Sequence, residues 1–250
     1  MPIATINPAT GETVKTFEEL SSAEIEARLA TAADTFARYR LTDLDTRAGW
    51  MRRAAQILDD ERDDIAAMLT TEMGKTLTAA KAEVAKCATA CRYYAEHTAE
   101  FLAARPADAA AVNASQAYVT YQPLGPVLAV MPWNFPLWQA MRFAAPALMA
   151  GNVGLLKHAS NVPQSALFLA ELFRRAGFPA GAFQTLLVGS GAVEGILRDR
   201  RVWRDFWMIP LRDLFGFAIW LGGLFGHEVE WRGQRLKLRR DGKIAKGKDR

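Results

Sequence analysis

The chain has 250 residues, half of them apolar, and a formal net charge of +4. This apolar content is enough to bury a sizeable core, which excludes a chain that is disordered throughout. The charge is uneven, because residues 201–250 hold 12 Lys and Arg against 6 Asp and Glu, whereas the first 200 residues hold 19 against 21. The composition therefore predicts two parts of different origin that meet near residue 200.

The two cysteines, Cys87 and Cys91, lie four residues apart in an alanine-rich segment. That spacing puts both side chains on one face of a helix, which suits neither a disulfide nor a zinc site. We interpret them as small buried apolar residues in a reduced, cytoplasmic environment. The first eight residues carry no basic region followed by an apolar run, so no secretory signal is expected. No metal-ligand spacing occurs either, and no metal site is predicted.

The N-terminal part is predicted to be mostly helical. Residues 7–11 (Asn-Pro-Ala-Thr-Gly) read as a turn between two short strands. Apolar residues then recur every three or four positions in three segments, which predicts helices over residues 22–39, 43–73 and 77–102. Ser22 and Asp43 are the expected N-caps, and Gly74 is expected to end the second helix.

Beyond residue 115 the pattern changes to short strands that alternate with helices. Residues 116–122 are predicted to form an exposed strand. Short apolar runs predict buried strands at residues 127–131, 153–157 and 183–188, separated by helices at residues 137–149 and 162–176. This alternation predicts an α/β fold whose core is an incomplete doubly wound, Rossmann-like parallel sheet of three strands.

Ligands of such sheets bind beyond the carboxyl ends of the strands, so the residues after each apolar run are candidates for a site. Asn134 offers an amide that could stabilise an oxyanion, or that could instead bond to its own turn backbone. Lys157 ends a strand, where its ammonium could bind ribose or phosphate, or could simply be a surface charge. Gly189, Gly191 and Gly195 lead into a helix whose N–H groups could face an anion, but their spacing is one residue wider than the dinucleotide motif.

Several motifs, in the same order, resemble the NAD(P)-dependent aldehyde dehydrogenase family. They are Asn7-Pro8-Ala9-Thr10-Gly11, Glu72-Met73-Gly74-Lys75, Pro132-Trp133-Asn134-Phe135-Pro136, Ala150-Gly151-Asn152, Leu156-Lys157-His158-Ala159-Ser160, Ala176-Gly177-Phe178-Pro179 and Gly189-Ser190-Gly191. Within the family, the segment that begins at Lys157 is most similar to succinate-semialdehyde dehydrogenases. The resemblance covers residues 1–202, which it identifies as a partial cofactor-binding domain.

The resemblance implies roles for individual residues. Asn134 would stabilise the oxyanion of a thiohemiacetal, and Lys157 would hold the adenosine ribose. Ser160 stands where many NAD-preferring relatives have a carboxylate, which would repel a 2′-phosphate, so NADP is expected to be accepted as well as NAD. The cofactor-binding residues that the resemblance implies are Met131, Pro132, Trp133, Lys157, Ser160 and Gly191.

The family's general-base Glu and nucleophilic Cys have no counterpart here, and neither Cys87 nor Cys91 matches the nucleophile's position. Without a thiolate no thiohemiacetal forms. The resemblance therefore implies a truncated, chimeric oxidoreductase whose ancestor oxidised an aldehyde such as succinate semialdehyde with NADP or NAD. We expect it to be inactive. Whether it still binds the cofactor stays open at this point. The alternatives are a non-catalytic module that binds a membrane or a partner, including an intact paralogue, and an artificial join near residues 200–203.

Residues 203–250 depart from that family and form an apolar, then basic, tail. Residues 206–225 are mostly apolar, but Pro210, Arg212 and Asp213 interrupt them, which weakens the prediction of a membrane span. The nine Lys and Arg of residues 232–250 suit contact with a membrane surface, or a solvated and partly disordered end. Nucleic-acid binding is not predicted. The tail also resembles the extreme C-terminus of ceramide- or hopanoid-type glycosyltransferases, but without their catalytic region it predicts no glycosyl transfer.

Overall fold

The structure is a computed structural model that describes residues 3–197, 228–231, 234–238 and 244–246. The chain divides into two compact units, Met1–Val193 and Glu194–Arg250. The short helix α7 (Ala192–Leu197) spans the boundary between them. The candidate residues that follow the predicted strands all lie in the first unit, except Gly195.

The first unit begins with a hairpin of β1 (Ile3–Ile6) and β2 (Thr13–Phe17), which pair in antiparallel fashion. The turn between them is closed by the Gly11 N–H, which donates to the Asn7 carbonyl at 2.8 Å. Gly11 takes a φ of +74°, a left-handed conformation that glycine adopts without steric cost. The predicted turn at residues 7–11 is confirmed.

Four helices follow the hairpin: α1 (Ser22–Tyr39), α2 (Leu44–Asp60), α3 (Arg62–Met73) and α4 (Leu77–Phe101). Asp43 caps α2 as predicted, because its carboxylate accepts from the Thr46 N–H at 2.7 Å. The prediction of Ser22 as the N-cap of α1 is wrong. Ser21 caps this helix, since its hydroxyl and the Glu24 carboxylate accept from each other's backbone N–H groups in a capping box.

The single helix predicted over residues 43–73 is also wrong, because it is divided at Glu61. Glu61 leaves the helical conformation, with φ −102° and ψ 18°, and neither glycine nor proline marks this position. The break allows α2 and α3 each to pack against α4. Gly74 ends α3 in a left-handed conformation with φ +76°, as predicted.

The centre of the unit is a parallel sheet in the order β5-β6-β7, formed by β5 (Pro126–Val130), β6 (Val153–Lys157) and β7 (Phe183–Thr185). Helices α5 (Pro136–Met149) and α6 (Pro163–Ala176) connect the strands, which confirms the predicted α/β fold. Strand β7 is shorter than the predicted residues 183–188. The chain turns away after Leu186, and the Leu187 carbonyl accepts instead from the Leu20 N–H at 2.9 Å.

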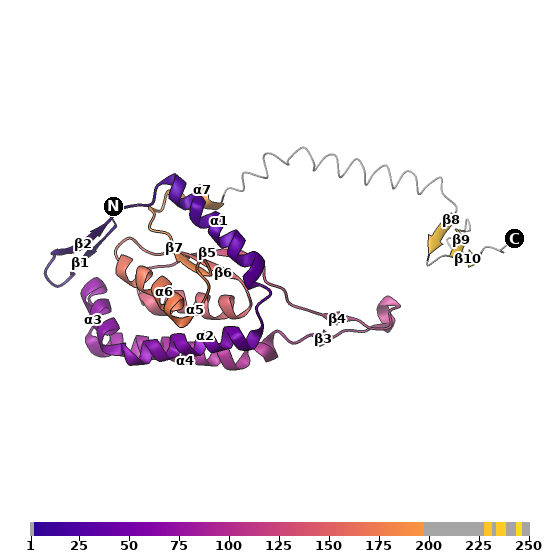
Figure 1. Cartoon of the computed structure of the whole chain (residues 1–250), viewed down its shortest axis with the longest axis horizontal. Helices are drawn as coiled ribbons and strands as arrows, with labels where there is room; N and C mark the ends of the chain where they lie inside the picture. Colours follow the sequence, from indigo (N-terminus) through magenta and orange to yellow (C-terminus); the bar gives the residue numbers. More distant parts are fainter. Residues whose placement is uncertain (1–2, 198–227, 232–233, 239–243, 247–250) are drawn as a thin grey trace. The chain divides into compact units, whose positions relative to one another are not determined.

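Figure 1 shows how the layers of this unit are arranged: α1 lies on one side of the sheet, while α5 and α6 lie on the other. Helices α2 and α4 run side by side and cover α5 and α6 from outside. Small residues dominate the interface between α4 and its neighbours, where Ala80, Val84 and Ala88 are fully buried. Side chains this small allow α4 to pack closely against α2, α3 and α5.

A second hairpin pairs β3 (Arg105–Pro106) with β4 (Tyr118–Val119) and carries the short helix η1 (Ala110–Val112) between them. The exposed strand predicted over residues 116–122 is thus present in part: Tyr118 and Val119 pair with β3, and the Ala117 carbonyl accepts from the Ala107 N–H at 2.9 Å. Pro106 has no N–H to donate, which limits the ladder on this side. Figure 1 shows the hairpin extending away from the helices of the first unit.

In the second unit, β8 (Glu228–Trp231), β9 (Gln234–Leu238) and β10 (Ile244–Lys246) form an antiparallel sheet in the order β10-β9-β8. The sequence patterns did not predict these strands. The apolar segment of residues 206–225 lies outside the described residues. Within the described ranges, no helix is both long and apolar enough to cross a membrane.

Replacement of Gly177 by Ala is expected to lower the free energy of unfolding by about 2 kcal/mol, as measured by urea denaturation. Gly177 ends α6 with φ +103°, and an added Cβ would lie 2.9 Å from Cδ1 of Trp50. Gly49→Ala is the matched control, because a Cβ at that position meets nothing within 4 Å. This control is expected to be neutral or slightly stabilising. Equal effects of the two variants would contradict the strain assigned to Gly177.

Candidate functional site

Three segments follow the strands of the parallel sheet, and hydrogen bonds bring them together. The Met131 N–H, just after β5, donates to the Lys157 carbonyl at the end of β6 at 3.0 Å. The Lys157 ammonium in turn lies 3.5 Å from the Ser190 hydroxyl, in the segment that follows β7. The structure thus places the candidate residues of all three segments at the carboxyl edge of the sheet, where ligands of this fold class bind.

Lys157 is almost fully buried, with 5% of its surface exposed. The alternative interpretation of a surface lysine therefore does not fit. No ion pair joins its ammonium to a carboxylate in the described part of the chain. A buried cation without a carboxylate partner favours the approach of an anionic or hydroxyl-rich ligand.

Asn134 lies in the β5–α5 loop (residues 131–135) and is exposed. No hydrogen bond engages its side-chain amide within the described ranges, so the amide is not used to close its own turn. The flanking Trp133 and Phe135 are each about half exposed. The loop therefore presents a free amide donor between two aromatic rings, and Pro132 and the half-buried Met131 precede them.

Ser160 and Gly191 border the same edge. Ser160 is half-exposed, and its carbonyl accepts from the Ala4 N–H of β1 at 3.2 Å. Its hydroxyl makes no hydrogen bond within the described ranges. Gly191 is exposed, and a Cβ built on it would meet nothing within 4 Å. Both positions thus leave room for a ligand. Gly195 belongs to the second unit, so it is not assigned to this edge.

The sequence analysis missed an acidic neighbour of this edge. A Cβ built on Gly189 would lie 3.2 Å from Oε1 of Glu19, whose position in the chain is 170 residues earlier. A carboxylate here disfavours a phosphate directly beside Gly189. No local pattern marks Glu19, because a contact between distant parts of the chain, the hydrogen bond from the Leu20 N–H to the Leu187 carbonyl, lies beside it.

Two further glutamates, also missed, occupy the N-termini of the helices that follow β5 and β6. Glu83 of α4 accepts from the N–H groups of Leu137 and Trp138 at the start of α5, both at 2.9 Å. Glu72 of α3 accepts in the same way from the N–H groups at the start of α6. The first N–H groups of these two helices therefore donate to the chain's own carboxylates and are not available to a phosphate.

Both cysteines are fully buried on α4. Burial raises the pKa of the Cys91 thiol to about 12 and that of Cys87 well above its ordinary value. The Cys91 Sγ lies 3.4 Å from Sδ of Met141, in an apolar contact between α4 and α5. The interpretation of both as buried apolar residues is confirmed, and neither supplies an accessible thiolate. Among the described residues no group of metal ligands is found.

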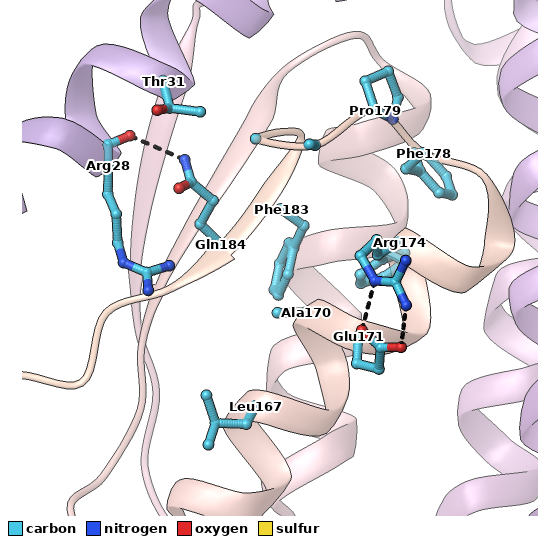
Figure 2. Close-up of a pocket in the computed structure, with 13 residues that line it drawn as sticks. Arg28, Thr31, Leu167, Ala170, Glu171, Arg174, Phe178, Pro179, Phe183 and Gln184 are labelled. Carbon is cyan, nitrogen blue, oxygen red and sulfur yellow. Dashed lines mark hydrogen bonds and ion pairs between the residues drawn. The ribbon is translucent and has the colours of Figure 1, made fainter. Parts of the chain in front are cut away.

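A cavity of about 350 Å³ lies elsewhere, between α1 and α6 beside β7 (Figure 2). Phe183 and Gln184 of β7 line this cavity. The side-chain amide of Gln184 donates to the Arg28 carbonyl at 3.0 Å. Glu171 and Arg174 form an ion pair at its wall, as Figure 2 shows. The loop that precedes β7 also lines this cavity, so it lies toward the amino end of the strand and is separate from the site described above.

Comparison with known proteins was informative for the first four-fifths of the chain. The sequence profile of the aldehyde dehydrogenase family matches residues 1–203. The chain is 67% identical over 202 residues to succinate-semialdehyde dehydrogenase [NADP(+)] 1 of Mycobacterium tuberculosis H37Rv, which covers 81% of this chain and 44% of the relative. It is 65% identical over 203 residues to succinate-semialdehyde dehydrogenase [NADP(+)] of Mycobacterium avium, with coverages of 81% and 43%.

Solved structures of succinate-semialdehyde dehydrogenases also superpose on this chain. The structure of succinic semialdehyde dehydrogenase from Streptococcus pyogenes in complex with NADP+ superposes with a TM-score of 0.75 at 37% identity, and covers 80% of this chain and 43% of that one. Succinate-semialdehyde dehydrogenase from Burkholderia pseudomallei superposes with a TM-score of 0.73 at 32% identity, with coverages of 79% and 40%. The chain therefore spans less than half the length of each of these relatives.

Proposed function

The chain belongs to the aldehyde dehydrogenase family through residues 1–203, and from this membership we propose that its first unit binds NADP, and NAD as well, at the carboxyl edge of the β5-β6-β7 sheet. The buried ammonium of Lys157, 3.5 Å from the Ser190 hydroxyl and without a carboxylate partner in the described part of the chain, is the observation that carries the proposal. Relatives of this chain are NADP-dependent succinate-semialdehyde dehydrogenases by name.

The residues at this edge suit the parts of a dinucleotide. Lys157 would donate to the adenosine ribose, while Ser160 would leave space and no negative charge for a 2′-phosphate. The exposed backbone at Gly191 would face the diphosphate, and Met131, Pro132 and Trp133 would line the cleft toward the nicotinamide. The bound cofactor supplies the hydride acceptor, which no side chain can provide.

Asn134 would donate its free amide N–H to the oxygen of an aldehyde whose carbonyl carbon is under attack, and so stabilise the oxyanion that develops. These 250 residues do not supply the attacking thiolate, because Cys87 and Cys91 are both buried with raised pKa values. We therefore propose that the chain by itself retains the cofactor side of an aldehyde dehydrogenase, with succinate semialdehyde as the ancestral substrate class, and does not oxidise it. We further propose that the dehydrogenase-like part ends near residue 202 and that the tail has a separate origin.

Binding of NADP by Lys157→Ala is expected to be at least about tenfold weaker than by the unaltered chain, because a charge-assisted hydrogen bond contributes about 1.5–3 kcal/mol. Isothermal titration calorimetry of the full chain with NADP measures the change. Lys81→Ala is the matched control, since Lys81 pairs with Asp63 on the exposed side of α4 and is expected to leave Kd unchanged. Equal affinity of both variants and of the unaltered chain would count against the assignment of the site.

A partner-binding role is the second candidate, and the β3–β4 hairpin favours it. Tyr118 and Val119 on β4 are 63% and 51% exposed, and Val112 on η1 is 65% exposed. Such exposed apolar residues on one extended element are typical of protein interfaces. Light scattering coupled to size-exclusion chromatography tests this role, because a hairpin that mediates assembly keeps the chain above its monomer mass of 27.6 kDa.

A further inference from the structure

We propose that Lys75, Glu83 and His158 are positioning residues that together clamp the β5–α5 loop, which carries Trp133 and Asn134. The clamp is formed by groups from two distant parts of the chain, the start of α4 and the end of β6. The role of the loop once it is held rests on the proposed function, but the clamp itself rests on hydrogen bonds, one ion pair and one cation–π contact.

The loop contains a strained residue. Phe135 takes φ +56° and ψ +61°, a left-handed conformation that is uncommon for a bulky aromatic side chain. A residue in this conformation persists only where surrounding contacts hold it. Phe135 is also the N-cap of α5, yet its side chain cannot accept a hydrogen bond from the first turn of that helix. The helix start therefore needs an acceptor from elsewhere.

Glu83 provides that acceptor. Its side chain is nearly fully buried, and Oε1 accepts from both the Leu137 and Trp138 N–H groups at 2.9 Å. Two of the unpaired N–H groups of the first turn are thus satisfied by one carboxylate oxygen. The second oxygen, Oε2, pairs with the Lys75 ammonium. A charge this deep in the protein is stable only with such partners.

Lys75 connects this ion pair to the strained residue. Its ammonium lies 4.3 Å from the centroid of the Phe135 ring, within the range of a cation–π interaction. Lys75 itself is only 10% exposed at its side chain, so solvent screens the contact weakly. The Glu83 carboxylate therefore fixes the end of the loop directly through the backbone and indirectly through Lys75.

His158 holds the loop from the other side. Its Nδ1 accepts from the Ala159 N–H at 2.9 Å, so Nε2 carries the proton and donates to the Pro136 carbonyl at 2.8 Å. At the other end of the loop, the Met131 N–H donates at 3.0 Å to the carbonyl of Lys157, the residue before His158. Burial lowers the pKa of His158, which keeps the ring neutral and able to both accept and donate. The buried imidazole thus holds the α5 end of the loop, and the backbone of the residue before it holds the β5 end.

Glu72 offers a matched comparison within the same chain. It is as deeply buried as Glu83 and accepts from two N–H groups at the start of α6, those of Gln164 and Ser165. It makes no hydrogen bond or ion pair with residues 131–136 in the described part of the chain. Removing its charge therefore perturbs a helix N-terminus of the same kind without touching the β5–α5 loop.

The test compares amide hydrogen exchange in the full chain and in Glu83→Gln, Lys75→Met, Lys75→Arg and Glu72→Gln. Exchange at residues 131–138 is expected to be about tenfold faster in Glu83→Gln and Lys75→Met. Lys75→Arg retains the cation and is expected to restore slow exchange. Glu72→Gln is expected to accelerate exchange in β1 and at the start of α6, which its carboxylate contacts, and not at residues 131–138. The affinity for NADP should fall about fivefold in Glu83→Gln and stay unchanged in Glu72→Gln.

Exchange at residues 131–138 that is unchanged in Glu83→Gln would overturn the clamp, whether or not NADP binds. The same acceleration there in Glu72→Gln would also overturn it, because the effect would then be a general loss of stability. Failure of the unaltered chain to bind NADP would instead refute the proposed cofactor role alone, and the exchange comparison would still decide the clamp.

Discussion

The purified 250-residue chain is expected to reduce NADP in the presence of succinate semialdehyde no faster than the uncatalysed reaction, at least about a million-fold below a complete dehydrogenase. Oxidation of an aldehyde to an acid through a thiohemiacetal requires a thiolate that reaches the carbonyl carbon. Cys87 and Cys91 are fully buried in α4, and burial raises both pKa values, that of Cys91 to about 12. Neither can attack, and the sequence contains no other cysteine.

The measurement is NADPH absorbance over several hours at high protein concentration. A Cys87→Ser/Cys91→Ser double variant serves as the control, and its rate should equal that of the unaltered chain. A rate that exceeds background and falls in Lys157→Ala would show that the chain oxidises the aldehyde with its own cofactor site, and a rate that falls in the double variant would assign the nucleophile to one of these thiols.

Replacement of Glu72 by Ala is expected to lower the free energy of unfolding by about 3 kcal/mol, which is a large part of the stability of a typical domain. Four donors bond to this one buried carboxylate: the Thr5 hydroxyl at 2.8 Å, the Gln164 N–H at 2.7 Å, and the Ser165 N–H and hydroxyl at 2.8 and 2.6 Å. The carboxylate therefore ties β1, α3 and α6 together. Its removal leaves buried donors without an acceptor, each of which costs about 1–3 kcal/mol.

Urea denaturation followed by far-ultraviolet circular dichroism measures the loss. Glu96→Ala on the exposed side of α4 is the control, and it should change the free energy of unfolding by less than about 0.5 kcal/mol. Glu72→Gln should fall between the two, since an amide oxygen still accepts from some of the donors. A loss in Glu72→Ala no larger than that in Glu96→Ala would mean that water replaces the carboxylate as acceptor.

Much of the local structure could be predicted from patterns in the sequence. The Asn7 turn, the cap at Asp43, the glycine stop at Gly74 and the alternation of strands and helices beyond residue 125 all appear in the structure. They were predictable because each depends on a few neighbouring residues whose conformational preferences agree. The errors also have local causes, since Ser21 and Ser22 are equally good caps by type and only the spacing to Glu24 distinguishes them.

The candidate residues of the sheet edge were predictable for a similar reason. Parallel strands end at one edge, so Asn134, Lys157 and Gly191 could be assigned to one place from strand order alone. Whether each of these side chains is buried or exposed, and so what it can bind, could not be predicted from the sequence. Whether Lys157 is a surface charge or a buried cation depends on how α1 and the segment after β7 pack against β6, and the structure shows it buried.

The sequence by itself determined the family, the order of the elements and the residue types at the carboxyl edge of the sheet, because these follow from short-range patterns and from ordered motifs. Only the tertiary structure decided which helix N-termini bond to a carboxylate of the chain and which residues hold the β5–α5 loop. Glu72 and Glu83 lie far along the chain from the N–H groups that they accept from, and no local pattern joins residues 54 or 92 positions apart. Packing of α3 and α4 against α5 and α6 brings those carboxylates into place, and burial then gives their hydrogen bonds the strength to set the geometry of the site.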